Sequence, residues 1–597
     1  MLHELEYPFD SEYILKKSKS LKRRLLEENT QRIPKKIAVL GGSTTHDIIR
    51  ILELFLLNQG IEPTFYESEY GMYWEDAMFG NEELNAFGPD LVYIHTSFRN
   101  LRSLPEVKDS REQVEDKLRS EFEHFQVMWE KLADTWHCPI IQDNFELPYY
   151  RLMGNQDGAD FHGRTWYVNR MNQMFADYAA EHQNFLINDI CYQSAAYGLD
   201  EWSAPFFWHM YKYSLCLKAI PWMAHNVANI MKSLYGKNKK SLVLDLDNTL
   251  WGGLAGETDH TPVVLSEDHS GLAYKNLQRV LKIMQSQGVL LAIASKNNEA
   301  DAMEILEHHP HMVLRPEDFA AQRINWDPKP DNIRKIAEEL NLGTDSFVFF
   351  DDSEAEREMV RQMLPEVEVP EFPARAEDLA PAMVKIYETY FAAAVITGED
   401  REKTAQYRAN AGRKQMEDRA GSFEEYVKKL EICLLPVDPK EHLDRLTQLL
   451  NKTNQFNLTT RRYTLEQMRQ ITEDTKKRVF LYQVTDVFGD NGIVAAAIVD
   501  TAGELPEITD FVMSCRVMGR NIENAVIDRI EQQMREEGYT VLRGRYVPTA
   551  KNKPVETMYD RLGYRKTDST PEGGTCYEIV LAERPERAYW LKENLYD

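Results

Sequence analysis

The chain has 597 residues, too many for a single hydrophobic core, since one domain usually holds about 100–200 residues. Its hydrophobic fraction of 43% and aromatic fraction of 11% are those of a folded protein rather than a disordered one. With 70 Lys and Arg against 96 Asp and Glu, the formal charge of −26 disfavours nucleic acid and anionic membranes as partners, though not a small anionic substrate.

The sequence carries no signal for a membrane or for secretion. No apolar run approaches the roughly 18–20 residues that a bilayer span requires. The start, MLHELEYPFD, lacks a basic stretch followed by an apolar one, so no signal peptide is predicted. The six cysteines are scattered and form no Cys-x-x-Cys pair, which suits a reducing compartment and offers neither a zinc site nor a disulfide framework. We therefore expect a cytoplasmic protein.

The first predicted domain covers residues 1–235 and alternates strands with helices. IAVLGG (Ile37–Gly42) and LVYIHT (Leu91–Thr96) are apolar throughout, which is typical of buried parallel strands. Long amphipathic stretches between and after them predict helices. This alternation predicts a doubly wound α/β domain, which ends at the small and basic residues Tyr235–Lys240.

The second and third predicted domains cover residues 236–395 and 396–597. In the second, strands are predicted at Ser241–Asp247, Val289–Ser295 and Ser346–Asp352, separated by helices, which again indicates a parallel sheet. The third begins with polar connector helices and continues with mixed α+β patterning.

Two acidic residues follow the first strand of the second domain. Asp245 and Asp247 lie where that strand ends, and ligand sites of open parallel sheets lie beyond the carboxyl ends of the strands. One carboxylate can attack phosphorus and form an aspartyl-phosphate while the other acts as general acid/base. Because two acids repel a phosphate, a hard cation such as Mg²⁺, which prefers oxygen ligands, is required.

Further polar residues follow in order at later strand ends. Ser295 ends the next strand and could donate its hydroxyl to a phosphate oxygen. Lys329 could balance charge on the nucleophile and the transferring phosphoryl group. Asp351 and Asp352 end a third strand and offer the remaining metal ligand. An acidic pair alone often marks a turn, but these elements in this order favour a phosphate-transfer site.

These residues resemble the haloacid dehalogenase superfamily, whose pattern is Asp-x-Asp-x-Thr, then Ser, Lys and Asp-Asp. The longer string LDLDNTLWGGLAGE (Leu244–Glu257) is similar to its FkbH-like branch of aspartate-nucleophile phosphatases and glyceryl transferases. The resemblance implies that Asp245 is the nucleophile and Asp247 the acid/base. It also implies that Asp245, the backbone carbonyl of Asp247, and Asp352 hold Mg²⁺.

Phosphate contacts are expected from Ser295, Lys329 and Asn248. Asp351 is left open between a metal ligand and an acid that orients another ligand. The intervals from Asp247 to Ser295 and on to Lys329 are mostly needed for a helix and a strand. A large lid domain therefore has no room, and an open site would admit a bulky substrate, such as a phosphorylated acyl group handed to a carrier-protein thiol.

The third domain shows two further resemblances. Within Thr447–Thr464, LNKTNQFNLTTRRYT is typical of FkbH-like proteins, although a polar helix end and loop would read the same way. Arg516–Asn521 precedes a predicted helix and resembles the acyl-CoA loop of GCN5-related acetyltransferases (GNAT): Gly519 allows close approach, whereas Asn521 replaces a glycine. Tyr559 stands where that family often has a general-acid tyrosine, or is a core aromatic. The resemblance implies acyl-CoA or phosphopantetheine as ligand.

The first domain resembles SGNH-type hydrolases. Ser43 follows the first strand and could be a nucleophile, with His209 and Asp200 as later members of the set. The pattern departs from the family, because Gly42 replaces the usual aspartate and the Asp200–His209 spacing is too wide. Ser43 as a helix cap and His209 as a packed ring therefore stay open.

The sequence thus predicts an α/β protein with a doubly wound HAD-like domain between an SGNH-like and a GNAT-like domain. We expect an Mg²⁺-dependent phosphatase, or a phosphate-releasing acyl (glyceryl-type) transferase that loads an acyl carrier protein. The alternatives are an acyltransferase with a supporting HAD domain and a scaffold, although the intact acid, Ser and Lys set argues against a scaffold. The expected partners are a phosphorylated small molecule and a carrier protein, without nucleic acid or membrane.

Overall fold

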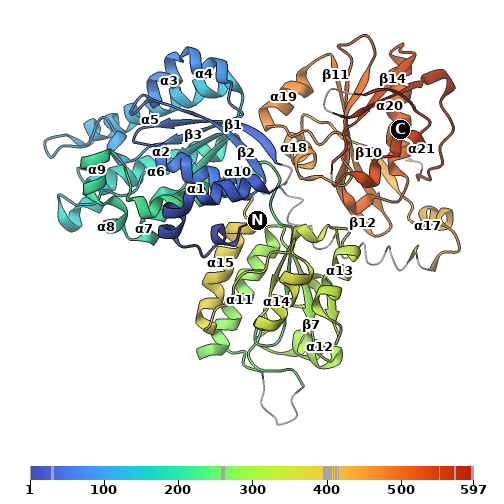
Figure 1. Ribbon diagram of the computed structural model, residues 1–597, viewed down its shortest axis with the longest axis horizontal. Helices are drawn as coiled ribbons and strands as arrows, with labels where there is room; N and C mark the ends of the chain where they lie inside the picture. The colour runs from blue at the N-terminus through green and yellow to red at the C-terminus, as the bar shows by residue number, and fades with distance from the viewer. Residues whose placement is uncertain are drawn as a thin grey trace. The chain divides into compact units, whose positions relative to one another are not determined.

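The structure is a computed structural model (Figure 1). It describes residues 2–28, 32–256, 263–393, 406–407, 409, 413, 416–417, 419–549, 551–569 and 573–592. The chain divides into two compact units, Met1–Leu234 together with Thr464–Gln467, and the remainder from Tyr235 onward.

The first unit is built on a parallel sheet in the strand order β2-β1-β3-β4-β5. Because β3 pairs with both β1 and β4, the carboxyl ends of these three strands are neighbours along one edge. The strands are β1 (Ile33–Gly41), β2 (Ile61–Glu67), β3 (Leu91–His95), β4 (Ile140–Asp143) and β5 (Phe185–Asn188).

Helices cover this sheet because its strands are apolar on both sides. On one face of the sheet, Leu40 of β1 and Ile94 of β3 pack with the cluster that holds Trp129 and Met171. The neighbouring residues of the same strands, which point to the other face, are also buried. The helices are α1 (Ser11–Glu27), α2 (His46–Asn58), α3 (Tyr73–Phe79), α4 (Glu82–Phe87), α5 (Arg111–Trp136), α6 (Arg164–Glu181), α7 (Ile190–Tyr197), α8 (Leu199–Ser203), α9 (Pro205–Tyr211) and α10 (Ile220–Leu234).

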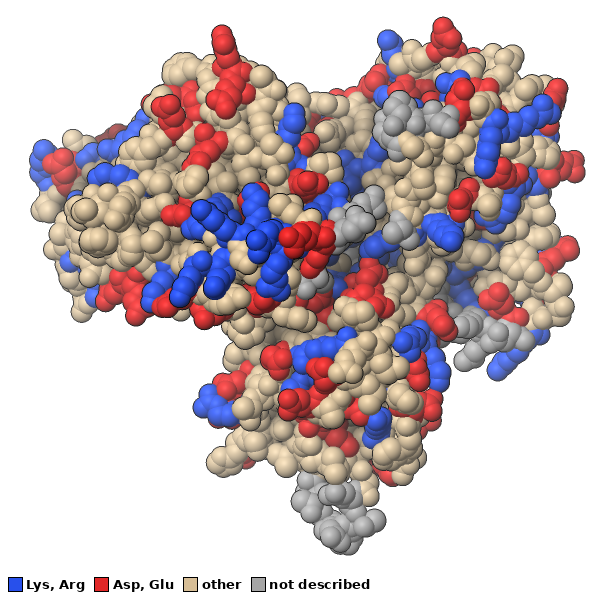
Figure 2. Space-filling model, in the orientation of Figure 1, with Lys and Arg blue, Asp and Glu red and all other residues tan. Residues whose placement is uncertain are grey.

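Helix α1 begins after a capping aspartate and carries basic side chains on its solvent side. The side chain of Asp10 accepts hydrogen bonds from the backbone N–H groups of Glu12 and Tyr13, which caps the first turn. The solvent side of α1 carries lysines and arginines, and Figure 2 shows basic side chains gathered over this helix. The net negative charge of the chain is therefore unevenly spread.

The second unit begins with a four-stranded parallel sheet in the order β8-β7-β6-β9. Its strands are buried on both faces: Leu244 and Ile293 pack with α11 and α15, whereas Val243 and Ala292 pack with α13 and α14. The elements are β6 (Ser241–Leu244), α11 (His269–Ser286), β7 (Leu290–Ser295), α12 (Glu299–His308), β8 (Phe319–Ile324), α13 (Lys329–Glu339), β9 (Phe347–Phe350), α14 (Glu354–Met363) and α15 (Leu379–Tyr390).

The same unit continues with a seven-stranded sheet in the order β10-β11-β12-β13-β14-β16-β15. All neighbours are antiparallel except β13 and β14, which run parallel and pair only at Glu507–Arg543 and Ile508–Gly544 before they diverge. The elements are α17 (Phe423–Lys429), β10 (Cys433–Pro436), α18 (Leu443–Lys452), α19 (Leu465–Glu473), β11 (Lys477–Asp486), β12 (Gly489–Asp500), β13 (Glu507–Met513), α20 (Ile522–Glu536), β14 (Val541–Tyr546), α21 (Met558–Arg561), β15 (Arg565–Ser569) and β16 (Thr575–Val580).

The α/β class with doubly wound parallel sheets, expected from strand–helix alternation, is confirmed. The predicted boundary after residue 235 lies one residue from the division between the units. The boundary predicted at residues 395–396 lies outside the described residues, so a separate third domain stays a prediction. Among the residues that are described, no helix is both long and apolar enough to cross a membrane.

Candidate functional site

Polar side chains converge at the carboxyl edge of the β8-β7-β6-β9 sheet. Leu244, the last residue of β6, is in register with Phe350, the last residue of β9, so Asp245 and the pair Asp351–Asp352 follow at the same level. Ser295 ends β7 on the other side of β6. Parallel register thus brings together residues that are up to 107 positions apart in the sequence (352 − 245).

Three carboxylates form the centre of this site. Asp245, Asp351 and Asp352 each offer an oxygen within 4.8 Å of the others. Asp245 and Asp351 are buried and Asp352 is partly buried. Clustered carboxylate oxygens are the ligands that Mg²⁺ or Ca²⁺ prefers. The two predicted carboxylate ligands, Asp245 and Asp352, are therefore neighbours, and Asp351 joins them; a role for the carbonyl of Asp247 stays a prediction.

Lys329 supplies the positive charge of the cluster. It is the first residue of α13, is 3% exposed, and its Nζ lies 2.8 Å from Oδ1 of Asp245 and forms an ion pair with Asp351. Burial opposes the charged form of Lys329, but the two carboxylates outweigh burial and raise the pKa of the lysine. Burial, followed by the charge of Asp245, raises the pKa of Asp351 to about 6 despite Lys329.

Asp247 is held apart from the cluster by its own hydrogen bonds. Its Oδ1 accepts from Trp251 Nε1 at 2.9 Å and from the backbone N–H of Ala255 at 3.0 Å, and its Oδ2 accepts from Asn297 Nδ2 at 2.9 Å. Burial raises the pKa of Asp247, and these bonds oppose the rise. A positioned carboxyl whose pKa lies above the ordinary value suits a general acid/base.

The two remaining predicted phosphate contacts lie beside these acids. Ser295 is buried, and its Oγ lies 3.5 Å from Asn297 Nδ2. Asn248 has a left-handed backbone (φ 52°), and its Oδ1 accepts from the backbone N–H of Gly253 at 2.9 Å. Its side chain also hydrogen-bonds Asp352. Asn248 thus links the turn after β6 to the end of β9, and a phosphate contact by either residue stays a prediction.

Arg357 and Asn297 belong to this site but were missed in the sequence. Nη1 of Arg357 donates to the backbone carbonyls of Asp351 and Asp352 at 2.9 and 2.8 Å, which fixes the turn that presents both acids. Asn297 was detectable as a polar residue just past the end of β7. Arg357 lies inside α14, where an arginine carries no distinguishing sequence signal.

In the first unit the structure does not support the catalytic set of Ser43 with His209, one of the alternatives that the sequence left open. Ser43 follows β1 and is buried, whereas His209 lies exposed on α9, none of whose residues is buried. The histidine near Ser43 is His95 instead, the last residue of β3, which contacts Ser214 Oγ at 3.0 Å; Ser43 Oγ lies 3.3 Å from the same atom. The physical reason is the strand order, because β3 pairs directly with β1.

Two single residues were predicted as functional in the C-terminal sheet region, and their surroundings differ; a ligand contact by Gly519 stays a prediction. Gly519 has a φ of +74° in the loop before α20, and a Cβ placed there would meet open space. Tyr559 is 1% exposed, and its ring packs over Gly544 and against Tyr577 at a centroid separation of 5.1 Å. Burial raises the pKa of Tyr559. Of the two roles left open for Tyr559, this burial supports the core aromatic and not the accessible general acid.

The string at Thr447–Thr464 has a structural role between diverging strands. The backbone N–H of Leu458 donates to Phe511 of β13, and the carbonyl of Leu458 accepts from Val547, which follows β14. The N–H of Met513 donates to the carbonyl of Phe456. The segment therefore supplies the backbone partners that β13 and β14 no longer give each other.

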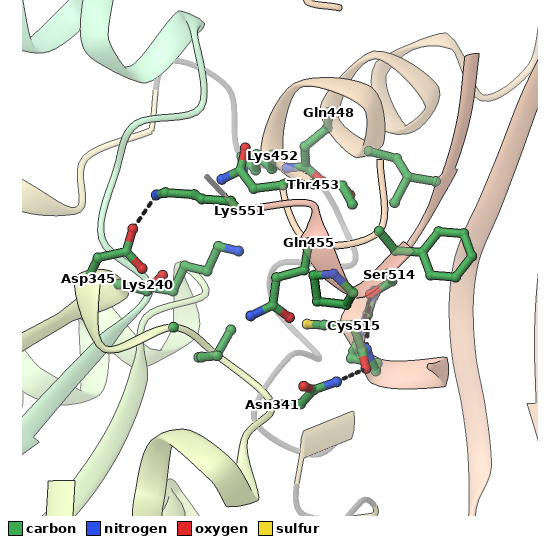
Figure 3. Close-up of a pocket in the computed structure, with 18 of the residues that line it drawn as sticks. Lys240, Asn341, Asp345, Gln448, Lys452, Thr453, Gln455, Ser514, Cys515 and Lys551 are labelled. Atoms are coloured by element: carbon green, nitrogen blue, oxygen red, sulfur yellow. Dashed lines mark hydrogen bonds and ion pairs between the residues drawn. The ribbon is translucent and has the colours of Figure 1, made fainter. Parts of the chain in front are cut away.

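A separate cationic pocket of about 380 Å³ lies in the second unit (Figure 3). Lys240 precedes β6 and Asp345 precedes β9, so the pocket is at the amino ends of the strands, the edge opposite to the carboxylate cluster. Asp345 forms an ion pair with Lys551, and Asn341 Nδ2 donates to the carbonyl of Cys515 at 2.7 Å. Its basic lining residues are Lys240, Arg445, Lys452, Arg516 and Lys551.

Two family models match the first two predicted domains of the chain. Residues 36–232 match the family model described as FkbH, N-terminal domain, and residues 238–369 match the model described as Acid Phosphatase. A solved structure, the N-terminal part of protein BF1531 from Bacteroides fragilis containing a phosphatase domain complexed with Mg, is 28% identical. That alignment covers 64% of this chain and 99% of the other, with a TM-score of 0.57.

Other solved structures align with about a quarter of the chain. The ribosomal-protein-S18-alanine N-acetyltransferase from Escherichia coli is 11% identical, covers 27% of this chain and 99% of its own, and has a TM-score of 0.20. An N-acetyltransferase from Staphylococcus aureus Mu50 is 13% identical, covers 25% and 98%, and has a TM-score of 0.21. No curated protein sequence matches the chain.

Proposed function

We propose that this chain, which joins an FkbH-type N-terminal domain to a HAD-like phosphatase domain, hydrolyses phosphate esters through Asp245 with the help of Mg²⁺. The observation that carries the proposal is the buried cluster in which Lys329 Nζ lies 2.8 Å from Asp245 Oδ1 beside Asp351 and Asp352. Three carboxylates with one lysine leave an excess of negative charge where an anionic substrate must bind.

The donor set fits Mg²⁺. Asp245, Asp351 and Asp352 offer carboxylate oxygens close enough to share one ion, and Mg²⁺ prefers such ligands. When bound, the ion would neutralise charge on the carboxylates and on the phosphate. The Mg-complexed phosphatase domain of the Bacteroides fragilis structure supports this choice of metal.

The contacts support the following chemical roles. Asp245 attacks phosphorus and forms an aspartyl-phosphate while the bond to the leaving oxygen breaks. Asp247 gives its proton to that oxygen and then takes a proton from the water that releases phosphate. Lys329 holds the Asp245 carboxylate in place and stabilises negative charge on the transferring group. Ser295 and Asn248 are proposed phosphate contacts.

A second candidate function is transfer of the acyl part of an acyl phosphate to a carrier-protein thiol. The cationic pocket favours it, because its five basic residues suit the phosphate of acyl-CoA or of a phosphopantetheine arm. The substrate class common to both candidates is a phosphorylated small molecule. A cytoplasmic setting, in keeping with the free cysteines, is part of the proposal.

Phosphate release from phosphorylated three-carbon acids, with and without carrier protein, tests both candidates. Free phosphate without a change in carrier mass indicates a phosphatase, and phosphate with an acylated carrier indicates a transferase. Asp245→Asn should abolish release in either case. Asp331→Asn is the matched control, because Asp331 lies on α13, is 45% exposed and pairs with Arg334 one turn further along the same helix. Turnover retained by Asp245→Asn would overturn the proposed function.

A further inference from the structure

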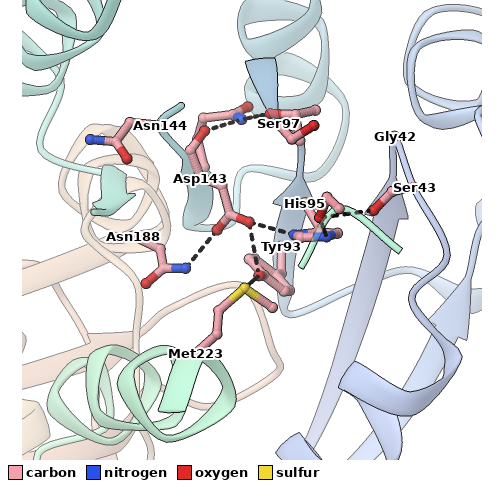
Figure 4. A network of polar contacts seen from close by, with 12 residues as sticks. Gly42, Ser43, Tyr93, His95, Ser97, Asp143, Asn144, Asn188 and Met223 are labelled. Atoms are coloured by element: carbon pink, nitrogen blue, oxygen red, sulfur yellow. Dashed lines mark hydrogen bonds and ion pairs between the residues drawn. The ribbon is translucent and has the colours of Figure 1, made fainter. Parts of the chain in front are cut away.

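The first unit contains a second set of reactive groups at the carboxyl edge of its own sheet (Figure 4). Ser214 Oγ lies 3.0 Å from His95 Nε2, and His95 Nδ1 lies 2.6 Å from Asp143 Oδ2. A hydroxyl, an imidazole and a carboxylate joined in this order allow the imidazole to take the hydroxyl proton while the carboxylate orients the ring. This set differs from the predicted Ser43 and His209.

The strand order assembles the set. His95 is the last residue of β3 and Asp143 the last residue of β4, and these strands are paired. Ser214 comes from the loop after α9, 119 positions beyond His95. Ligand sites of parallel sheets lie beyond such strand ends. The set therefore lies where active sites are usually found in folds of this type.

The carboxylate is held in one orientation. Asp143 Oδ1 accepts from Asn188 Nδ2 at 2.7 Å, and its Oδ2 also accepts from the Tyr93 hydroxyl at 3.1 Å. Gln193 and Asn226 both donate to Asn188 Oδ1, which turns the NH₂ group of Asn188 toward Asp143. Burial raises the pKa of Asp143, and the hydrogen bonds from His95, Asn188 and Tyr93 oppose the rise.

These contacts set the direction of each hydrogen bond. Because an ionised Asp143 can only accept, His95 Nδ1 is the donor and His95 Nε2 is left as an acceptor. The Ser214 hydroxyl is then the donor to Nε2. Ser43 Oγ donates to Ser214 Oγ at 3.3 Å, which leaves the Ser214 proton free to point at His95. Each donor thus faces the next acceptor from Ser43 to Asp143.

We infer that Ser214, His95 and Asp143 form a serine acyl-transfer centre for carboxylic esters or thioesters, separate from the phosphatase site. His95 Nε2 takes the hydroxyl proton as Ser214 Oγ bonds to the acyl carbon, and the leaving alkoxide or thiolate departs with that proton. Water then attacks the acyl-serine by the same proton route, which releases the acid and restores the Ser214 hydroxyl.

The loop that leads into Ser214 is hydrogen-bonded to the turn after β1, and the centre itself is buried. Ser214 is 3% exposed and His95 is 1% exposed. The backbone N–H of Thr44 donates to the Lys212 carbonyl at 3.0 Å, and Thr44 Oγ1 donates to the Tyr211 carbonyl at 2.7 Å. The preceding α9 has no buried residue. Substrate entry therefore requires a local movement. The exposed residues Tyr211 and Lys212 can move with little loss of burial, whereas the buried Tyr213 is held by the bond from its hydroxyl to Asp47 Oδ2 at 2.6 Å.

Labelling of the full, unmutated chain with a fluorophosphonate, followed by peptide mass mapping, tests the inference without depending on any variant. The expected result is one adduct, on Ser214. No adduct would mean that the contacts serve only as a buried, satisfied polar network and would overturn the inference. An adduct on Ser43 would overturn the assignment of Ser214. Neither result bears on Asp245.

Variants then test the partners. His95→Asn and Asp143→Asn should each slow labelling at least about 100-fold, since the base and its orienting acid are lost. The control is Ser194→Ala, which removes a buried hydroxyl of α7 that donates to the Cys191 carbonyl at 3.0 Å outside the set. It should label like the unmutated chain. An unchanged rate in folded His95→Asn, judged by its circular dichroism and melting, would contradict the inference.

The hydrogen bond between Thr44 and Tyr211 has its own test. Thr44→Val keeps the shape of the side chain but removes the hydrogen bond to Tyr211. Labelling of Ser214 should become faster, because the exposed Tyr211 and Lys212 then move more freely beside it. An unchanged rate would show that this bond does not limit access to Ser214 and would overturn the role given to Tyr211 and Lys212.

Discussion

Nζ of Lys329 lies 2.8 Å from Oδ1 of Asp245, with both side chains less than a tenth exposed. The two residues come from different elements, the end of β6 and the start of α13. A buried pair of this kind is costly to break, since removal of one partner leaves the other charge uncompensated. The pair therefore serves both the fold of the site and the charge balance of the proposed reaction.

Replacement of the lysine tests that double role. Lys329→Met should lower kcat for an aryl phosphate at least about 100-fold, because the charge that stabilises the transferring group is lost. It should also destabilise the second unit by about 3–5 kcal/mol, since Asp245 and Asp351 lose their cation. Steady-state kinetics and thermal unfolding measure the two effects. Near-normal kcat in a folded variant would contradict the role of Lys329.

Removal of metal provides a second test. EDTA should suppress phosphate release and Mg²⁺ should restore it, because the carboxylates otherwise repel the substrate. Mg²⁺ should also raise the melting temperature of the unmutated chain by binding the folded state. Asp352→Asn should require at least about tenfold more Mg²⁺ for half-maximal activity. Activity that is indifferent to EDTA would favour the acyltransferase alternative.

Asn297 is predicted to position Asp247. Asn297→Ala removes the hydrogen bond to Asp247 Oδ2 and should lower kcat about tenfold with little change in KM, since the acid/base is less well oriented. Asn298→Ala is the control, because the side chain of Asn298 is exposed and contacts Asp301 instead. Equal kinetics for the two variants would show that Asn297 does not position Asp247 for catalysis.

The cationic pocket can be tested apart from catalysis. Lys452→Glu reverses one of its five basic residues and should weaken binding of acyl-CoA at least about tenfold, with the loss reduced at high salt. Lys428→Glu on α17, an exposed lysine paired with Glu424, should leave binding unchanged. Calorimetric titration gives both affinities. Equal binding by the two variants would show that the pocket is not the binding site of acyl-CoA.

A pH dependence of stability is expected from Glu146. Burial raises the pKa of Glu146 to about 8, although Arg99 at 3.2 Å opposes the rise. The folded state then binds this proton more tightly than the unfolded state, whose pKa is near 4.5, so stability falls as pH rises from about 4.5 to 8. Glu146→Gln should reduce that fall in thermal unfolding measured at pH 5 and pH 9. Parallel losses in both proteins would disprove the protonated carboxyl.

Part of the site could be predicted from the sequence, because its polar residues follow directly after predicted strands. Asp245, Ser295 and Asp351–Asp352 follow apolar strands, and parallel pairing alone predicts that they meet. Lys329 was detectable from its place in that order.

Other site residues could not be predicted from the sequence, because only the tertiary structure brings them together. His95 ends a predicted strand, but its partner Ser214 lies in a loop with no periodicity to mark it. Arg357 acts through backbone carbonyls, which no side-chain pattern reveals. The role of Tyr559 stayed open in the sequence because a motif position does not report burial; in the structure its ring packs over Gly544.

The central claim is that the Asp245 carboxylate becomes phosphorylated. Acid quenching of the full chain during turnover of an aryl phosphate, followed by peptide mass mapping, tests this directly. We expect one phosphoryl group, labile to hydroxylamine, on the peptide that contains Asp245, and none in Asp245→Asn. A phosphoryl group on another residue, or turnover with Asp245 never modified, would contradict it.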